Sequence, residues 1–239
     1  MSHAKAMDRD NARDLIVTAF RTRMRTTPFA KLRISDLIKE LGLNRNTFYY
    51  HFSGKGDLAL FAFREDLDRR LRTIAPEREL LTQGPGDDPF AGLAFYASVE
   101  TGAHTLEHGA FVRCLLGCIR DDTLLYRNLL TDRGQELACS LRALWSFALL
   151  RDIDFILAGR YMDDRVKTLL AHQEAIGLIG LARYATNHPD VVDALIDDRI
   201  NPFCNYAMES IHNAIQKHPL TPLGDHATEQ PTPLTNKPL

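Results

Sequence analysis

A short turn near the N-terminus is the feature that most restricts how this chain folds. It reads Leu-Gly-Leu-Asn at residues 41–44 and separates two segments in which apolar residues recur at helical spacing. Gly42 can adopt the positive φ that ends a helix without steric cost. Asn44 is a good N-cap, because its side-chain oxygen can accept a hydrogen bond from a free backbone amide. The sequence therefore predicts a helix, a tight turn and a second helix of about two turns.

The second helix of this motif is rich in side chains that suit phosphates and base edges better than a protein core. Its polar and aromatic members are Arg45, Asn46, Thr47, Tyr49, Tyr50 and His51. A short polar and aromatic helix behind a glycine turn is what a helix-turn-helix places in the major groove of DNA. The alternative is an antiparallel helical hairpin inside an all-α core, which the composition of the second helix disfavours.

The apolar residues around the turn predict a small three-helix unit. One face of the first motif helix and the second helix contribute Ile34, Leu37, Ile38, Leu41, Leu43, Phe48 and Phe52. Upstream, a further helical stripe consists of Ala12, Leu15, Ile16, Ala19, Phe20 and Met24. This stripe predicts a helix of roughly 18 residues that begins near Asp8 and ends before Pro28, which disfavours helix at the residue preceding it.

Residues 8–60 resemble the TetR family of bacterial transcriptional regulators. The positions in register with the family pattern are Ile34, Asp36, Leu37, Gly42, Leu43, Thr47, Phe48, Tyr49, Phe52, Lys55 and Leu58. The run Asn-Arg-Asn-Thr-Phe-Tyr-Tyr-His-Phe at residues 44–52 is among the more specific marks of the family. Beyond about residue 75, the chain shows only a compatible length and helical pattern.

The resemblance implies an all-α fold with an N-terminal helix-turn-helix DNA-binding domain at residues 1–58. A helical ligand-binding and dimerisation domain is expected at residues 59–217. Residues 218–239 contain five of the eleven prolines of the chain, and this composition predicts a disordered tail. In this interpretation the protein is a homodimer that binds a palindromic operator in double-stranded DNA, with residues 44–51 of the two subunits in successive major grooves about one turn apart.

We expect the side chains of the second motif helix to divide into two roles, because base contacts specify sequence and phosphate contacts set register. The candidates for base contacts are Arg45, Asn46 and Tyr50. The candidates for phosphate contacts are Thr47, Tyr49, His51 and Lys55, assisted by Arg33. Arg33 stands where the family usually has a capping Thr, and it can still reach phosphate as a cation. Asn46 replaces a common Gly and adds a side chain that can read adenine.

The distribution of charge agrees with nucleic-acid binding at one end of the chain. Residues 1–58 contain 11 Lys and Arg against 6 Asp and Glu, whereas the remainder contains 18 against 25. No apolar run approaches the roughly 18 residues of a membrane span, and the N-terminus lacks the apolar stretch of a secretory signal. We therefore expect a cytoplasmic protein whose four cysteines are thiols.

The remainder of the chain is expected to be helical, with no β pattern. The expected helices cover residues 55–74, 89–108, 111–119, 124–130, 137–150, 163–187 and 190–217, and residues 82–89 are expected to form a loop. Residues 89–108 are apolar nearly all round, which is typical of a central buried helix. Pro202 is expected to kink or break the last helix.

An apolar stripe on the helix at 163–187 bears on assembly. Its members are Val166, Leu169, Leu170, Gln173, Ile176, Gly177, Gly180 and Tyr184. By resemblance, the last two long helices form the homodimer interface as a four-helix bundle with their twofold mates. The alternative is ordinary packing within one domain.

The resemblance also implies a small-molecule effector that binds the C-terminal helical domain. The candidate wall residues are Phe95, Tyr96, His104, Phe111, Tyr126, Trp145 and Phe155, and an aromatic and aliphatic lining would favour a hydrophobic ligand. The alternative for each of them is a plain core position. A second functional hypothesis is a DNA-associated adaptor or architectural protein that uses the same fold without an effector.

Other chemistry has weaker support in the sequence. His104 and His108 are one helical turn apart, as are Cys114 and Cys118, and together these side chains would make a zinc set. Buried cysteines are more often small apolar residues, so no metal and no cofactor are expected. No phosphate-binding loop, nucleophile elbow or dinucleotide fingerprint is present. We therefore do not expect an enzyme.

Overall fold

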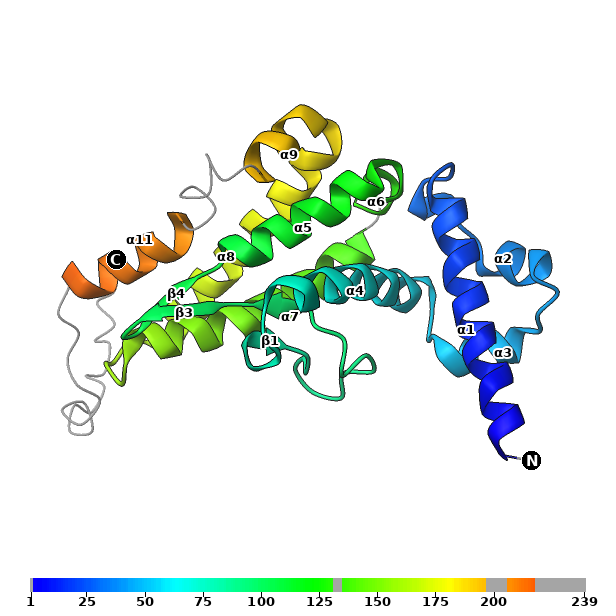
Figure 1. The fold of residues 1–239 in the computed structure, drawn as a ribbon, viewed down its shortest axis with the longest axis horizontal. Coiled ribbons are helices and arrows are strands. Elements are labelled where there is room, and N and C mark those ends of the chain that lie inside the picture. The colour runs from blue at the N-terminus through cyan, green and yellow to red at the C-terminus, as the bar shows by residue number, and fades with distance from the viewer. Residues whose placement is uncertain (1, 131–134, 197–205, 218–239) are drawn as a thin grey trace, which may run out of the picture.

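The computed structural model describes residues 2–130, 135–196 and 206–217. Within these ranges the fold is all-α with four short strands, and Figure 1 shows an elongated molecule with a small N-terminal unit at one end. That unit contains α1 (Ser2–Met24), α2 (Ile34–Glu40) and α3 (Arg45–His51). Helix α4 (Lys55–Ile74) leads from it into the body, with the predicted bounds.

The core of the N-terminal unit is built from the predicted apolar positions. Ile16, Phe20, Leu37 and Phe48 are almost completely buried. Two details of the prediction for α1 are wrong. The helix begins at Ser2, which is earlier than expected, and the Leu15 side chain is 45% exposed because it lies on the outer side of the helix.

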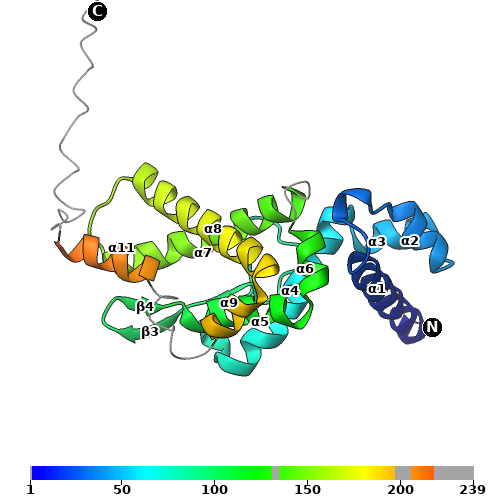
Figure 2. The same cartoon turned by 90° about the horizontal axis from the view of Figure 1, so that it is seen from above.

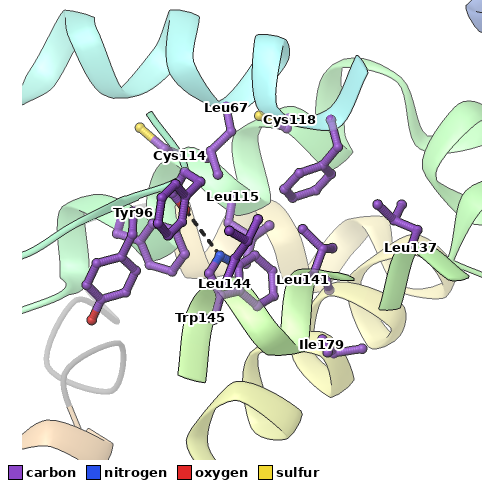
Figure 3. Packing of buried hydrophobic residues seen from close by; sticks show 14 of the residues in the cluster. Leu67, Tyr96, Cys114, Leu115, Cys118, Leu137, Leu141, Leu144, Trp145 and Ile179 are labelled. Carbon is purple, nitrogen blue, oxygen red and sulfur yellow. Dashed lines mark hydrogen bonds between the residues drawn. The ribbon is translucent and has the colours of Figure 1, made fainter. Parts of the chain in front are cut away.

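The body is formed by α4 and the later helices. These are α5 (Gly109–Asp121), α6 (Thr123–Leu129), α7 (Gln135–Leu157), α8 (Asp164–Asn187), α9 (Pro189–Ile196) and α11 (Tyr206–Lys217). Helices α7 and α8 pack along each other, and α5 lies against α4, α8 and α9. Figure 3 shows Trp145 of α7 inside the shared core, where its indole nitrogen donates to the Phe95 carbonyl at 3.1 Å. None of the helices within the described ranges is both long and apolar enough to cross a membrane.

The prediction of a buried helix at residues 89–108 is wrong. The segment contains β2 (Tyr96–Ala97), which pairs with β1 (Leu80–Leu81), and the hairpin of β3 (Val99–Gly102) and β4 (Thr105–Glu107). Gly92 and His104 have positive φ values of +97° and +57°, which a continuous helix does not allow. The apolar composition reflects burial of the segment between helices, and a short apolar run does not by itself distinguish a strand from a helix.

At residues 190–217, where one helix with a kink or break at Pro202 was expected, the described residues form two helices, α9 and α11. Helix α9 packs against α5, whereas α11 packs against α7 and β4, so the two helices have different neighbours (Figures 1 and 2). The expected break at Pro202 and the expected tail at 218–239 lie outside the described residues. Helix α7 extends seven residues beyond the predicted end at residue 150, to Leu157.

A buried ion pair attaches the loop after β1 to the side of α4. The Arg64 guanidinium donates to both carboxylate oxygens of Asp88 at 2.7 and 2.8 Å and to the Leu93 carbonyl at 2.6 Å. Burial alone would raise the pKa of Asp88, but hydrogen bonds from Arg64 and from the Phe90 and Gly84 amides outweigh burial and lower the pKa.

Replacing Arg64 with methionine should destabilise the fold by about 3–5 kcal/mol, because it leaves the Asp88 carboxylate buried without its cation. Urea unfolding at neutral pH measures this change. The pKa of Asp88 is lowered on folding, so its contribution is present above about pH 4 and is lost as the pH falls through its folded pKa. The difference in the free energy of unfolding between the variant and the natural chain should therefore become smaller at acidic pH. The control Arg69→Met removes a side chain that is 69% exposed and should cost under about 1 kcal/mol. Equal losses in both variants would contradict this account of the loop.

Candidate nucleic-acid interface

The turn between α2 and α3 has the predicted geometry. Gly42 has a φ of +64°, and the Leu43 amide donates to the Ile38 carbonyl at 3.0 Å, which closes the end of α2. The Asn44 side-chain oxygen accepts from the Thr47 amide at 2.8 Å, so the predicted N-cap is confirmed. Because hydrogen bonds fix both ends of the turn, they also fix the direction of the α3 axis relative to α2.

Helix α3 buries one apolar residue and presents its polar side chains outward. Phe48 is fully buried against the N-terminal core, whereas Tyr49 and Tyr50 are 44% and 64% exposed. Arg45 and Asn46 are also exposed. The Arg45 guanidinium carbon lies 5.3 Å from the centroid of the Tyr49 ring, an arrangement that orients the cation along the helix surface. The structure therefore brings these four predicted side chains to one outer surface.

The other predicted contact residues lie on α3, at the N-cap of α2 and at the start of α4. Thr47 and His51 are half-buried, and Arg33 is exposed at the N-cap position of α2, where its side chain makes no capping bond. Lys55 is half-buried at the start of α4. Its ammonium donates to the Phe29 carbonyl at 3.3 Å and lies 4.7 Å from the centroid of the Phe29 ring. Sequence reasoning missed this contact, because no local pattern connects residues 26 positions apart.

Charged and polar contacts attach the N-terminal unit to the body. Arg21 of α1 pairs with Asp66 of α4 and donates to the Ala62 carbonyl at 2.9 Å. The Tyr126 hydroxyl of α6 donates to the same Asp66 carboxylate at 2.6 Å. The Asn128 side-chain amide donates to the Met24 carbonyl at 2.8 Å, at the end of α1. Figure 2 shows α6 and α4 beside the base of this unit. A displacement of α4 or α6 in the body therefore acts directly on α1.

The structure separates the seven candidate wall residues for a ligand. Tyr96 and Phe155 line one cavity of about 510 Å³. Phe95, Phe111 and Trp145 are fully buried core residues, and Tyr126 lines a smaller hollow beside α1. His104 is exposed in the turn of the β3–β4 hairpin, where its Nδ1 lies 3.1 Å from the Phe155 carbonyl.

Sequence reasoning missed three acidic residues that line the cavity of about 510 Å³, namely Glu79, Glu100 and Asp152. A lone carboxylate on the apolar face of α7 was a usable signal for Asp152. Glu79 had no such signal, because it lies in a 3-10 helix of only three residues after α4, Glu77–Glu79.

The two histidines and two cysteines of the hypothetical zinc set lie in different environments. His108 belongs to a buried network with Tyr96 and Asp152, and His104 is in the exposed turn. Burial raises the pKa of the Cys114 thiol to about 11 and raises the pKa of Cys118 further, which disfavours the thiolates that bind zinc. Among the residues that the structure describes, no group of three or more His, Cys, Asp or Glu side chains is arranged to hold a metal ion.

Comparison with known proteins identifies the N-terminal unit. Residues 18–61 match the family model described as bacterial regulatory proteins, tetR family. A search of curated proteins finds no match. Among solved structures, a dihydroxyacetone kinase operon activator, DhaS, is 12% identical, with a TM-score of 0.45 over 86% of this chain and 97% of that chain. A gamma-butyrolactone receptor (ArpA like protein) is 13% identical, with a TM-score of 0.39 over 87% and 99%. Both TM-scores are below 0.5, so the assignment rests on residues 18–61.

Two asparagines of the same short segment should respond differently to replacement. Asn44→Ala removes the cap of α3 and should lower the free energy of unfolding by about 1 kcal/mol. Asn46→Ala removes an exposed side chain and should change it by less than about 0.5 kcal/mol. Thermal and urea unfolding of the full chain measure both effects, and equal losses would contradict the assigned roles.

Proposed function

We propose that this chain, a DNA-binding regulator of the tetR family through residues 18–61, is a repressor that binds a palindromic operator as a homodimer and leaves it when a small molecule binds. The observation that carries the proposal is the outer surface of α3, on which Arg45, Asn46 and Tyr50 are exposed while Phe48 holds the helix to its core. The direction of regulation follows the family resemblance.

The proposed division of roles follows the chemistry of each side chain. Arg45 and Asn46 can form paired hydrogen bonds to guanine and adenine edges, and Tyr50 extends beside them. The hydroxyl groups of Thr47 and Tyr49, the His51 ring and the Lys55 ammonium would hold phosphates, with Arg33 assisting. Lys55 can serve in this role only by adding a phosphate to its Phe29 contact or by exchanging one for the other.

The proposed dimer forms through α8. Four apolar side chains of this helix are between 45% and 64% exposed, namely Val166, Leu169, Ile176 and Tyr184. Nothing lies within 4 Å of the positions that a Cβ would occupy at Gly177 and Gly180, so a second helix can approach closely there. A hollow between α7 and α8 adjoins Ile176 and Gly180. These features favour a twofold contact centred on α8, with α7 beside it.

Effector release requires a ligand that binds the DNA-incompetent arrangement more tightly than the competent one. The contacts of Arg21, Tyr126 and Asn128 support a mechanical connection, because they join α1 to the body through α4 and α6. A ligand that displaces these body helices would change the separation of the two α3 helices in a dimer.

Substitutions at Arg45 and Lys55 should have different effects on DNA binding. Arg45→Ala should weaken the free energy of operator binding by about 1–3 kcal/mol. It should also relax the sequence preference at one operator position. Lys55→Ala should weaken binding to every sequence and reduce the salt slope by about 1. Fluorescence anisotropy with operator and random duplexes measures both, and a melting curve corrects for the Phe29 contact that Lys55 loses. If both variants affect specific and random DNA alike, the assigned roles are wrong.

Leu169→Glu should convert the dimer to a monomer, because it places a carboxylate in each half of the apolar contact. Light scattering after size-exclusion chromatography measures the mass. The matched control is Leu124→Glu on α6, where the leucine is 55% exposed and is not one of the residues of the proposed contact, and this variant should remain dimeric. A monomeric natural chain, or a dimeric Leu169→Glu variant, would refute the proposed interface.

A further inference from the structure

A cavity of about 510 Å³ lies between α7 and the short strands that follow α4. Leu80 and Leu81 of β1, Leu106 of β4 and Phe155 of α7 form its apolar wall. Its volume falls in the range of about 300–1,000 Å³ that is typical of small-molecule sites. The cavity is therefore large enough for a small organic ligand with an apolar body.

The polar floor of the cavity is a hydrogen-bonded carboxylate. Asp152 accepts from the Tyr96 hydroxyl at 2.7 Å and from the Ser98 hydroxyl at 3.1 Å, and the Nε2 atom of His108 lies 2.8 Å from it. Burial, followed by the nearby Asp152 charge, raises the pKa of Tyr96 well above its ordinary value, so Tyr96 remains a phenol that donates. These donors fix the carboxylate in place at the floor.

The least exposed charges of the lining are the carboxylates of Asp152 and Glu79, whereas Glu100, Arg78 and Arg151 are exposed. The side chains of Asp152 and Glu79 are 10% and 17% exposed, whereas that of Arg78 is 85% exposed. Arg151, the other cation of the lining, is also exposed. A charge away from water acts more strongly than one surrounded by it. The interior of the cavity is therefore negative, although cations are present at its rim.

We propose that this cavity binds a small organic cation with an apolar body, and that this ligand is the effector of the proposed function, on which this second step rests. The ammonium group contacts Asp152 and Glu79, and the rings of Tyr96 and Phe155 offer cation–π contacts beside them. The body of the ligand lies against Leu80 and Leu81.

The cavity wall is continuous with the end of α4. The wall residues 78–81 follow α4 after Ala75 and Pro76. Arg72 in the last turn of α4 bonds to the Glu77 carboxylate at 2.6 Å and to the Gly92 carbonyl at 2.8 Å. A ligand that moves this wall therefore acts on the helix that leads to the DNA-binding unit.

The test compares three probes with the same phenylbutyl skeleton, namely 4-phenylbutylamine, 4-phenyl-1-butanol and 4-phenylbutyrate. Isothermal calorimetry on the full chain without DNA should show binding of the amine, binding of the alcohol at least tenfold weaker, and no detectable binding of the acid. Asp152→Asn should weaken amine binding at least tenfold, and Glu79→Gln should weaken it several-fold. The control Asp154→Asn removes a carboxylate of α7 that is 59% exposed and bonds to Lys167, and it should bind the amine like the natural chain.

Three results would overturn the proposed ligand class. They are no amine binding by the folded chain, acid binding as tight as amine binding, or unchanged amine binding in Glu79→Gln, which keeps the Asp152 network intact. The same preparations are tested for DNA binding without probe. A chain that binds DNA but no amine contradicts the ligand inference alone, whereas a chain that binds the amine but no DNA contradicts the proposed function alone.

Discussion

The outward position of α3 depends on the turn at residues 41–44. The positive φ of Gly42 ends α2, and the Asn44 side chain accepts from the Thr47 amide in the first turn of α3. With the start of the helix fixed, the helical period places Phe48 in the core and the neighbouring polar residues on the outside. A different entry angle would withdraw Phe48 from its core, so the packing and the exposed surface require the same turn.

The second requirement is a firm attachment between this unit and the body. Arg21 bonds to α4 at both a carboxylate and a carbonyl, and Tyr126 donates to the carboxylate that Arg21 contacts. Hydrogen bonds of this kind fix direction as well as distance, because the donors and acceptors must stay aligned. In the proposed dimer, the position of α3 relative to the partner subunit would therefore depend on the packing of α4, α6 and α8. A ligand bound in the body would then change DNA binding without contacting α3 or the DNA.

Local signals in the sequence predicted the turn at residues 41–44 and the bounds of α4, because these boundaries have residues with one strong preference, whereas the predicted start of α1 was too late. Gly42, Asn44 and Pro76 mark helix ends through φ, capping and the missing amide, and the observed bounds of α4 agree with the prediction. The prediction of a helix at residues 89–108 failed for a physical reason. A segment buried on several sides is apolar in any conformation, so its composition carries no period that separates a helix from a hairpin.

The cavity was beyond local prediction for a different reason. Its lining combines residues 78–81, 96–106 and 148–155, which only the tertiary fold brings together. Aromatic residues were the sequence signal for a ligand site, yet most of them fill the core around Trp145 (Figure 3). Of the two least exposed carboxylates of the lining, Asp152 had a signal in its place on the apolar face of α7, whereas nothing in the sequence indicates the position of Glu79.

The central claim is that α3 reads DNA as one half of a twofold pair. Selection of fragments from a random DNA pool by the purified full chain tests it most directly, followed by sequencing of the bound fraction. The account predicts enrichment of an inverted repeat whose half-site centres are about 10 base pairs apart, or a multiple of that spacing. A bound fraction with the composition of the starting pool, or a single asymmetric site, would contradict it.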